Sequence, residues 1–224
     1  MTDAGSFWED PDRVEEFAGR EPDRRLVELL ESFEQPGVTR VLDLGCAGGR
    51  NTAVLAERGF DVQAIDSSSS MVARTRGRVE TLLGNGEAER RVRVGRMEDL
   101  SDFASGSFQL VVALGVYHNA VSEEKWEQAL KETARVLVPH GLVLVATFTP
   151  DFRPHGEKLR RVAGSSHLYE GFDAGPLYLL EADELDAEMA RHGMVPVVPT
   201  ETVEAATDTG RRVTANGLYR KRGR

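Results

Sequence analysis

Residues 41–50 read VLDLGCAGGR and decide the fold, because an apolar run passes directly into a glycine-rich turn and then into a helical pattern. The glycines of the turn, Gly45, Gly48 and Gly49, permit positive φ angles and leave no Cβ between the backbone and a ligand. Free N–H groups at the start of the following helix favour an anion. The stretch therefore predicts a strand, a tight turn and a helix, either as a plain connection or as a ligand-binding loop.

Short apolar runs rich in branched residues alternate with amphipathic helical patterns along the rest of the chain. Runs that are apolar on both faces of a strand suit a parallel sheet with helices on both sides. The expected strands are residues 40–44, 61–65, 92–95, 108–114 and 142–148, and the expected helices are residues 52–58, 70–80, 123–137 and 181–192. We therefore predict an α/β doubly wound sheet.

The two ends of the chain differ from this alternating middle. Residues 1–35 carry apolar residues at helical spacing, which predicts an N-terminal helical cap within the same domain as the core, residues 36–224. Residues from about 150 to 180 are irregular and contain Gly, Pro, His and Tyr, which indicates a substrate-covering insertion. The runs 195–203 and 212–220 indicate an antiparallel pair at one end of the sheet.

Length, charge and cysteine content limit the function classes. The chain has 224 residues, 28 Lys and Arg against 37 Asp and Glu, and a net charge of −9. This charge argues against a nucleic-acid partner, because binding to the phosphate backbone needs a cationic surface. The acidic start lacks the apolar segment of a secretory signal, and no run is long enough to span a membrane. We expect a cytoplasmic monomer or homodimer with no membrane partner, and the single cysteine, Cys46, excludes a disulfide framework.

Asp66 ends the second expected strand and points to a nucleoside ligand. An acidic residue roughly 20 residues beyond a glycine turn accepts hydrogen bonds from the ribose hydroxyls of a nucleoside. Asp66 also suits a cap for the helix that follows. Counted from Gly45, the other two glycine positions of the dinucleotide motif hold Ala47 and Arg50, and no GxxxxGK[ST] motif occurs, which disfavours dinucleotides and nucleoside triphosphates.

Five stretches in order resemble the motifs of class I S-adenosylmethionine-dependent methyltransferases. VLDLGCAGGR resembles the first motif, an acidic residue followed by G-x-G-x-G; Asp43, Gly45 and Gly49 match it and Ala47 replaces the middle glycine. The later stretches are SSSSMV, GRMEDL, SFQLVVALGVYHN and VLVPHGLVLVATF. The resemblance implies a Rossmann-like, seven-stranded and mostly parallel sheet with the strand order 3-2-1-4-5-7-6.

The resemblance also implies a cofactor site for S-adenosylmethionine, with S-adenosylhomocysteine as product and no metal. The implied cofactor-binding residues are Asp43, Gly45, Cys46, Ala47, Gly49, Asp66, Ser67, Met71, Met97, Glu98, Leu114 and Gly115. Arg96 stands where the family commonly has an aspartate that accepts from the adenine amino group, so Glu98 or the backbone of Met97 would replace that contact. Ala47 would crowd the ligand if its position requires a positive φ.

Tyr117 and His118, at the exit of the fourth expected strand, are the catalytic candidates. His118 titrates near neutral pH and suits a general base for a hydroxyl, amine or thiol nucleophile. Tyr117 suits a role in orienting the acceptor or in a cation–π contact with the sulfonium. Both residues also suit structural positions, Tyr117 under the cap and His118 at the start of a helix. On the cap, Trp8 or Phe17 is a candidate to close over the cofactor.

The expected function is in-line methyl transfer from S-adenosylmethionine to a small-molecule acceptor. We expect no extra domain for the recognition of protein, RNA or DNA, so the only partner expected is the small-molecule acceptor. Two alternatives remain open. One is a non-catalytic protein that binds S-adenosylmethionine or S-adenosylhomocysteine, and the other is a nucleotide-dependent oxidoreductase.

Overall fold

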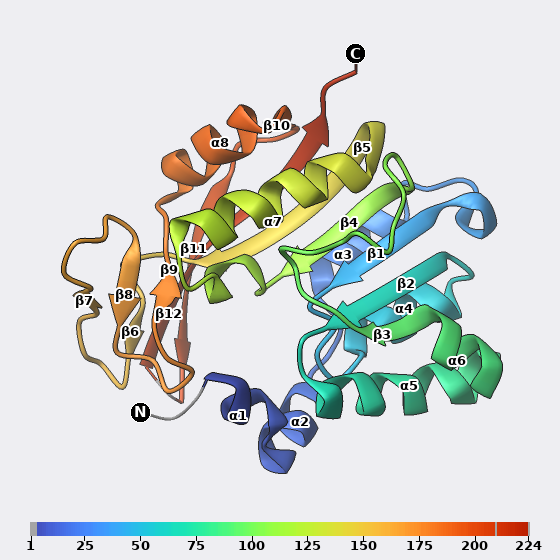
Figure 1. Ribbon diagram of the computed structural model, residues 1–224, viewed down its shortest axis with the longest axis horizontal. Coiled ribbons are helices and arrows are strands. Elements are labelled where there is room, and N and C mark those ends of the chain that lie inside the picture. Colours follow the sequence, from blue (N-terminus) through green and yellow to red (C-terminus); the bar gives the residue numbers. More distant parts are fainter. Residues whose placement is uncertain (1–3, 209, 224) are drawn as a thin grey trace.

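The computed structural model describes residues 4–208 and 210–223. A central sheet crosses the molecule with helices on both faces (Figure 1). Its parallel strands are β1 (Arg40–Leu44), β2 (Asp61–Asp66), β3 (Val92–Val94), β4 (Phe108–Leu114) and β5 (Leu137–Phe148). Along the sheet they lie in the order β5-β4-β1-β2-β3, which confirms the predicted arrangement of the first five strands.

The C-terminal strands complete the sheet beyond β5. β12 (Gly210–Lys221) pairs antiparallel with β5, and β10 (Met194–Pro196) pairs antiparallel with β12. In the predicted order, β12 is the seventh strand and β10 is the sixth. β11 (Glu201–Thr207) and β6 (Arg153–Pro154) also pair with β12, so this sheet has nine strands rather than seven. The expected single run 195–203 is divided between β10 and β11, because the prolines in it supply no N–H to a ladder.

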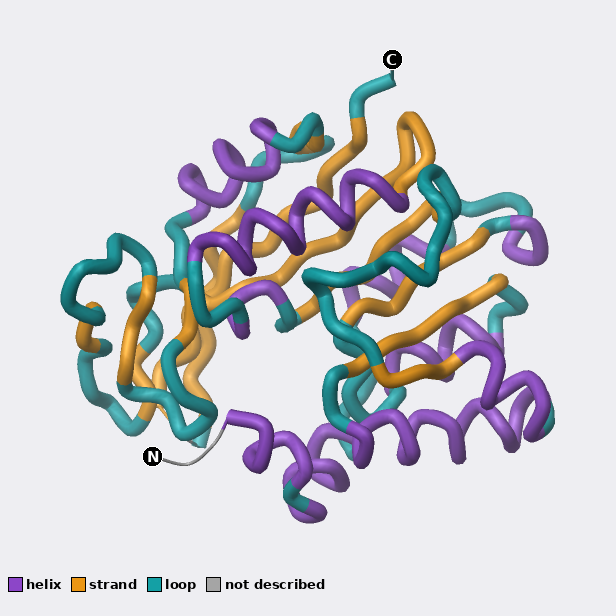
Figure 2. The backbone as a smooth tube through the Cα atoms, viewed as in Figure 1, coloured by secondary structure: helices purple, strands orange, loops and turns teal. Residues whose placement is uncertain are grey.

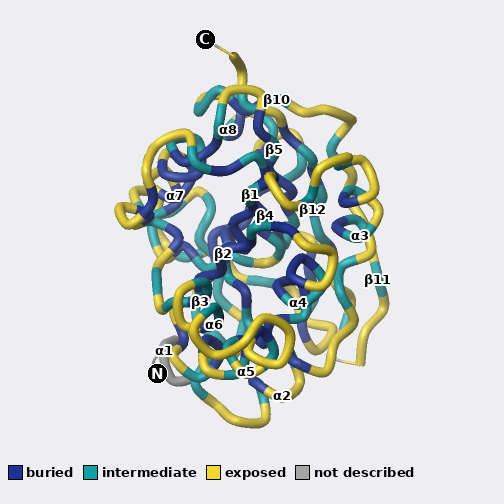
Figure 3. The backbone as a smooth tube through the Cα atoms, turned by 90° about the vertical axis from the view of Figure 1, so that its right-hand side faces the viewer, coloured by how far each residue is buried: buried dark blue, intermediate teal, exposed yellow. Residues whose placement is uncertain are grey.

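Successive residues of the central strands face opposite layers of the core. Val41 packs in the cluster under α3 (Arg24–Leu30) and α4 (Arg50–Glu57), whereas Leu42 packs in the cluster under α7 (Glu123–Val136) and α8 (Ala182–Arg191). The strands are therefore apolar on both faces, as expected for a sheet buried on both sides. Figure 3 shows the buried backbone concentrated along the strands and the inner sides of the helices.

The remaining helices lie around β2, β3 and the start of the chain. α1 (Ala4–Glu9) and α2 (Pro11–Ala18) lie beside the start of α5 (Ser69–Leu83), which α6 (Asn85–Arg91) follows (Figure 1). Short 3₁₀ turns, η1 (Pro36–Val38) and η2 (Tyr117–Asn119), precede β1 and follow β4. No helix within the described residues is long and apolar enough to cross a membrane.

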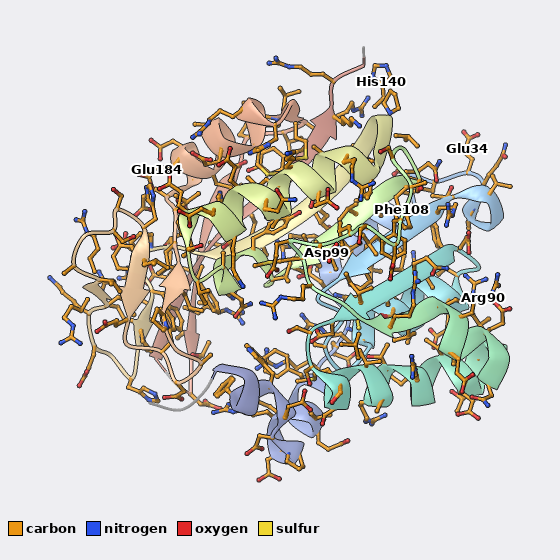
Figure 4. The ribbon with its side chains drawn as sticks, viewed as in Figure 1. Glu34, Arg90, Asp99, Phe108, His140 and Glu184 are labelled. Atoms are coloured by element: carbon orange, nitrogen blue, oxygen red, sulfur yellow. The ribbon has the colours of Figure 1, made fainter. Side chains whose placement is uncertain are left out.

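The segment from about 150 to 180 contains short strands where an irregular loop was expected. β7 (Arg160–Arg161), β8 (Leu168–Glu170) and β9 (Leu177–Tyr178) form a small antiparallel sheet at one side of the molecule (Figure 2). Tyr178 stacks on Trp126 of α7 at 4.9 Å between ring centroids, and its hydroxyl lies 3.1 Å from Nδ1 of His167. Nε2 of His167 lies 3.6 Å from a carboxylate oxygen of Glu184. Figure 4 labels Glu184 at the start of α8. Side-chain contacts thus attach this small sheet to the core.

Candidate active site

A cavity opens at the carboxyl ends of β1, β2 and β4. From β1 the chain builds outward to β2 and β3 on one side of the sheet and to β4 and β5 on the other, and open parallel sheets bind ligands where the order reverses in this way. The lining residues come from the cap, the glycine turn, the ends of the strands and η2; they are Trp8, Phe17, Leu44, Gly45, Cys46, Ala47, Arg50, Asn51, Ile65, Asp66, Ser67, Met71, Gly95, Arg96, Met97, Glu98, Leu114, Gly115, Val116 and Asn119.

The glycine turn depends on left-handed backbone conformations. Gly45 and Gly49 have φ angles of 74° and 80°, and Ala47 has a φ of 47°. Ala47 therefore occupies a position that does require positive φ, at a strain cost of about 1 kcal/mol. A Cβ on Gly45 would lie 2.8 Å from Cβ of Val116, so only glycine lets the turn approach the exit of β4 this closely.

The carboxylate of Asp66 is held at the edge of the cavity by backbone N–H groups. Oδ2 accepts from the N–H of Ala47 at 2.9 Å, and Oδ1 accepts from the N–H of Ser68 at 2.9 Å. Burial nevertheless raises the pKa of Asp66 above its ordinary value. A carboxylate oxygen can accept more than one hydrogen bond, so each oxygen of Asp66 can still accept one from a ligand.

Asp43 lies beneath the glycine turn rather than on the cavity. It is 2% exposed, and Oδ2 accepts from the hydroxyl of Thr52 in α4 at 2.6 Å. Burial raises the pKa of Asp43 to about 6. The hydrogen bond connects β1 to the first turns of α4 and so fixes the helix start against the turn.

Two cations, one from α7, meet at a carboxylate of the segment after β3. Oε1 of Glu98 accepts from Nε of Arg96 at 2.7 Å and from Nζ of Lys125 at 3.1 Å. Arg96 therefore does not replace the expected adenine acceptor but neutralises the neighbouring carboxylate. Glu98 and the backbone of Met97 remain the candidates for that contact, and both residues line the cavity.

The N-terminal cap packs directly on the glycine turn. A Cβ on Gly48 would lie 2.6 Å from Cα of Ala18, so α2 sits against the backbone of the turn. The rings of Trp8 and Phe17 meet edge to face at 5.4 Å and both line the cavity.

Glu9 fastens this cap to the start of α5. Its carboxylate accepts from the N–H groups of Ser69 and Ser70 at 2.8 and 3.1 Å, and from the hydroxyl of Ser70 at 2.6 Å. The Ser70 hydroxyl and the backbone N–H groups lower the pKa of Glu9 to about 2. The cap is therefore held by an ionised carboxylate at a helix N-terminus, a favourable electrostatic position.

The 3₁₀ turn η2 divides the residues after β4 between the cavity and the core. Val116 and Asn119 line the cavity. Tyr117 is fully buried, with its hydroxyl 2.7 Å from Oγ1 of Thr133. His118 is 5% exposed, and its Nδ1 accepts from the N–H of Phe148 at 3.3 Å.

A family model described as a methyltransferase domain matches residues 41–141 of the chain. These residues are a methyltransferase domain of the S-adenosylmethionine-dependent class. The match covers β1 to the start of β5, the part of the chain that carries the glycine turn, Asp66 and the exit of β4. The family predicted from the sequence motifs is therefore confirmed.

Curated relatives share this methyltransferase domain over part of their length. The ribosomal RNA small subunit methyltransferase C of Chromohalobacter salexigens is 35% identical over 127 residues, which are 55% of this chain and 36% of that protein. The chain spans less than half the length of the curated relatives that it matches.

Solved structures share the fold over most of the chain. A methyltransferase from Methanosarcina mazei has a TM-score of 0.67 at 18% identity and covers 88% of this chain and 98% of its own. A 1,6-didemethyltoxoflavin N1-methyltransferase from Burkholderia thailandensis, solved with S-adenosylhomocysteine, has a TM-score of 0.63 at 20% identity and covers 89% of this chain and 77% of its own. Both likenesses establish the Rossmann-like fold.

Most of the predicted cofactor residues of the methyltransferase domain meet at the cavity. All of them except Asp43 and Gly49 line it. Gly49 is at the N-terminus of α4, and the absence of a Cβ there lets the turn pack closely against Thr75 of α5. Cys46 is buried, and burial raises the pKa of its thiol. A thiol that stays protonated is not suited to act as a nucleophile.

The structure does not support the expected contact of Tyr117 and His118 with the acceptor. Neither side chain lines the cavity. Burial lowers the pKa of His118 to about 3, so the ring is neutral near pH 7. The ring stacks on Phe148 with 4.3 Å between the ring centroids. The nearby residues that do line the cavity, Val116 and Asn119, are separated by three positions. A 3₁₀ turn places residues i and i+3 on the same side, so the spacing of Val116 and Asn119 was the signal that could have indicated the residues facing the cavity.

Proposed function

We propose that the chain is an S-adenosylmethionine-dependent methyltransferase that acts on a small molecule. The observation that carries the proposal is the carboxylate of Asp66, which two backbone N–H groups hold at the edge of a cavity built by a glycine turn. A carboxylate oriented in this way suits a ribose diol, because it can accept from both hydroxyl groups. The methionine end of the cofactor would supply a methyl group on a sulfonium.

The other lining residues fit the remaining parts of that cofactor. Apolar side chains of Ile65, Met71 and Met97 flank the site near Asp66 and suit the faces of a planar base. Arg50, at the start of α4, also lines the cavity, and its guanidinium suits the cofactor carboxylate. The ring of Trp8 or Phe17, brought by the cap, would shield the ligand from water.

A small acceptor is favoured by the contact between the cap, which borders the cavity, and the insertion. Arg13 of α2 lies 3.8 Å from Asp173 of the insertion, so the cap and the insertion meet. We infer that the described part of residues 1–35 serves as a cap and that residues from about 150 to 180 cover the acceptor. Both segments would belong to one domain with the core, residues 36–224. Residues 1–3, 209 and 224 lie outside the described residues. The net charge of −9 is also unfavourable for an anionic macromolecule such as RNA.

Titration calorimetry tests the cofactor assignment directly. We expect heat on addition of S-adenosylmethionine and S-adenosylhomocysteine and none with NAD. Binding of NAD in place of the sulfur ligands would support an oxidoreductase instead. A screen of candidate acceptors, read by release of S-adenosylhomocysteine, then separates an enzyme from a protein that only binds the cofactor, and a screen that includes ribosomal RNA tests the small-molecule assignment.

A further inference from the structure

Asn119 is the polar side chain that the exit of β4 presents to the cavity. It stands at the end of η2, on the side shared with Val116, while Tyr117 and His118 face the core. β4 and β2 lie on opposite sides of β1 (Figure 1), so Asn119 lies across the cavity from Asp66. If Asp66 holds the ribose, Asn119 belongs to the half of the cavity that receives the acceptor.

The orientation of the Asn119 amide is fixed by its neighbours. Nδ2 donates to the carbonyl oxygens of Gly115 at 3.2 Å and Val116 at 3.1 Å. Because a carbonyl oxygen only accepts, the NH₂ group must face these two partners and Oδ1 must face away from them. No hydrogen bond to Oδ1 is found among the described residues, and Oδ1 is not among the buried polar atoms left without a partner. Oδ1 is therefore an accessible acceptor of hydrogen bonds.

The described residues of the cavity offer no free base beside Asn119. The titratable residues that line the cavity are Cys46, Arg50, Asp66, Arg96 and Glu98. Asp66 is held by backbone N–H groups at the end of β2, and Glu98 is paired with Arg96 and Lys125. His118 lies behind the turn with Nδ1 already accepting a hydrogen bond. An amide oxygen orients a donor but does not remove its proton.

We propose that Asn119 positions a nitrogen acceptor, a neutral amine, by accepting a hydrogen bond from its N–H group through Oδ1. This inference rests on the proposed function. A neutral nitrogen needs no base before it attacks, whereas a hydroxyl does, and a thiol is a weak hydrogen-bond donor. The nitrogen lone pair forms the new N–CH₃ bond, the S–CH₃ bond breaks with its electron pair passing to sulfur, and the positive charge moves to nitrogen, which then releases a proton to water.

Matched probes test the chemical class of the acceptor. Propylamine and benzylamine are compared with the alcohol and the thiol of the same carbon skeleton, with S-adenosylmethionine present, and mass spectrometry locates the added methyl group. We expect methyl transfer to nitrogen in preference to oxygen or sulfur. The rate should rise with pH as the amine itself loses its proton, with no additional step from a protein group between pH 5 and pH 8.

Variants of Asn119 test the residue itself. Asn119→Leu, of similar size, should lower kcat/KM for the amines by roughly tenfold or more, because a hydrogen bond to a nitrogen that becomes charged is lost. Its affinity for S-adenosylhomocysteine should change much less. Asn119→Asp retains an oxygen acceptor and should keep more of the rate than Asn119→Leu. Asn85→Leu, at an exposed asparagine at the start of α6, is the matched control and should not alter kcat/KM.

Three results would overturn the inference while S-adenosylhomocysteine still binds. They are transfer to oxygen or sulfur at least as fast as to nitrogen, an amine rate that Asn119→Leu leaves intact, and absence of transfer to either amine. A failure of S-adenosylhomocysteine to bind the wild-type protein overturns the proposed function, and the role of Asn119 with it. Calorimetry on the same samples therefore separates the two failures.

Discussion

The two halves of the cavity are fixed by different parts of the polypeptide. At the ends of β1 and β2, backbone N–H groups hold Asp66, and residues with positive φ form the turn. At the exit of β4, side chains set the geometry: the Asn119 amide binds two carbonyl groups, and the rings of His118 and Phe148 stack behind it. A backbone-built half tolerates few substitutions, whereas a side-chain-built half can change its acceptor without loss of the fold. Under the proposed function, the backbone-built half would be the cofactor site and the side-chain-built half the acceptor site.

The largest effect should come from removing the carboxylate of the backbone-built half. Asp66→Ala loses both hydrogen bonds that the proposal assigns to the ribose and leaves the N–H groups of Ala47 and Ser68 without their partner. We expect the affinity for S-adenosylhomocysteine to fall by about 100-fold or more, since each charge-assisted hydrogen bond contributes roughly 1.5–3 kcal/mol. Calorimetry provides the measurement. Asp102→Ala, at an exposed carboxylate, is the control, and an equal affinity in the two variants would remove Asp66 from the site.

Insertion of a methyl group between the cap and the glycine turn should have the next largest effect. Gly48→Ala places a Cβ 2.6 Å from Cα of Ala18, and neither backbone can move freely. We expect the free energy of unfolding to fall by about 1–3 kcal/mol, as for other overpacked positions. Gly37→Ala is the matched control, because a Cβ there meets nothing within 4 Å. Thermal unfolding curves that coincide for the two variants would show that the cap does not pack on the turn.

The pH dependence of stability should distinguish a buried structural histidine from a base. Burial lowers the pKa of His118 from 6.5 to about 3, so the unfolded chain binds the proton more readily than the folded chain. The stabilising contribution of the neutral ring is therefore complete above pH 6.5 and is lost as the pH falls from 6.5 towards 3. The slope contributed by one group reaches about 1.4 kcal/mol per pH unit.

Denaturant unfolding between pH 8 and pH 4 provides the measurement for His118. His118→Gln should flatten the profile relative to the wild-type protein, whereas His140→Gln, at an exposed histidine, should not. Parallel profiles for the wild-type protein and His118→Gln would mean that His118 already exchanges its proton in the folded state, as a general base must.

The smallest effect should come from relieving the strain in the turn. Ala47→Gly replaces a residue that has a φ of 47° and should raise the free energy of unfolding by roughly 0.5–1 kcal/mol. Ala73→Gly, in the exposed face of α5, should instead lower it by roughly 1 kcal/mol. The midpoint of chemical unfolding reports both changes. A loss of stability in Ala47→Gly would show that the turn is not strained at this position.

The backbone-built half could be predicted from the sequence because its residues carry local conformational meaning. Gly45 and Gly49 indicate positive φ angles, and Asp66 directly follows an apolar run, so the local sequence alone places it at the end of a strand. The tertiary contact between Gly48 and α2 could not be read in this way, because nothing local to either segment specifies it.

The exit of β4 was harder to predict because the direction of its side chains depends on the pitch of the following turn. In the structure the 3₁₀ turn buries His118 and places Asn119 at the cavity. The strands of the insertion were missed for a related reason. β7, β8 and β9 have two or three residues each and are held by tertiary contacts such as Tyr178 on Trp126.

A crystal structure of the protein with S-adenosylhomocysteine tests the central assignment most directly. We expect both ribose hydroxyl groups to lie within hydrogen-bonding distance of the Asp66 carboxylate, the base to lie between the apolar side chains near β2 and β3, and the sulfur to be directed towards Asn119. A ligand bound elsewhere, or one in this cavity whose ribose makes no contact with Asp66, would contradict it.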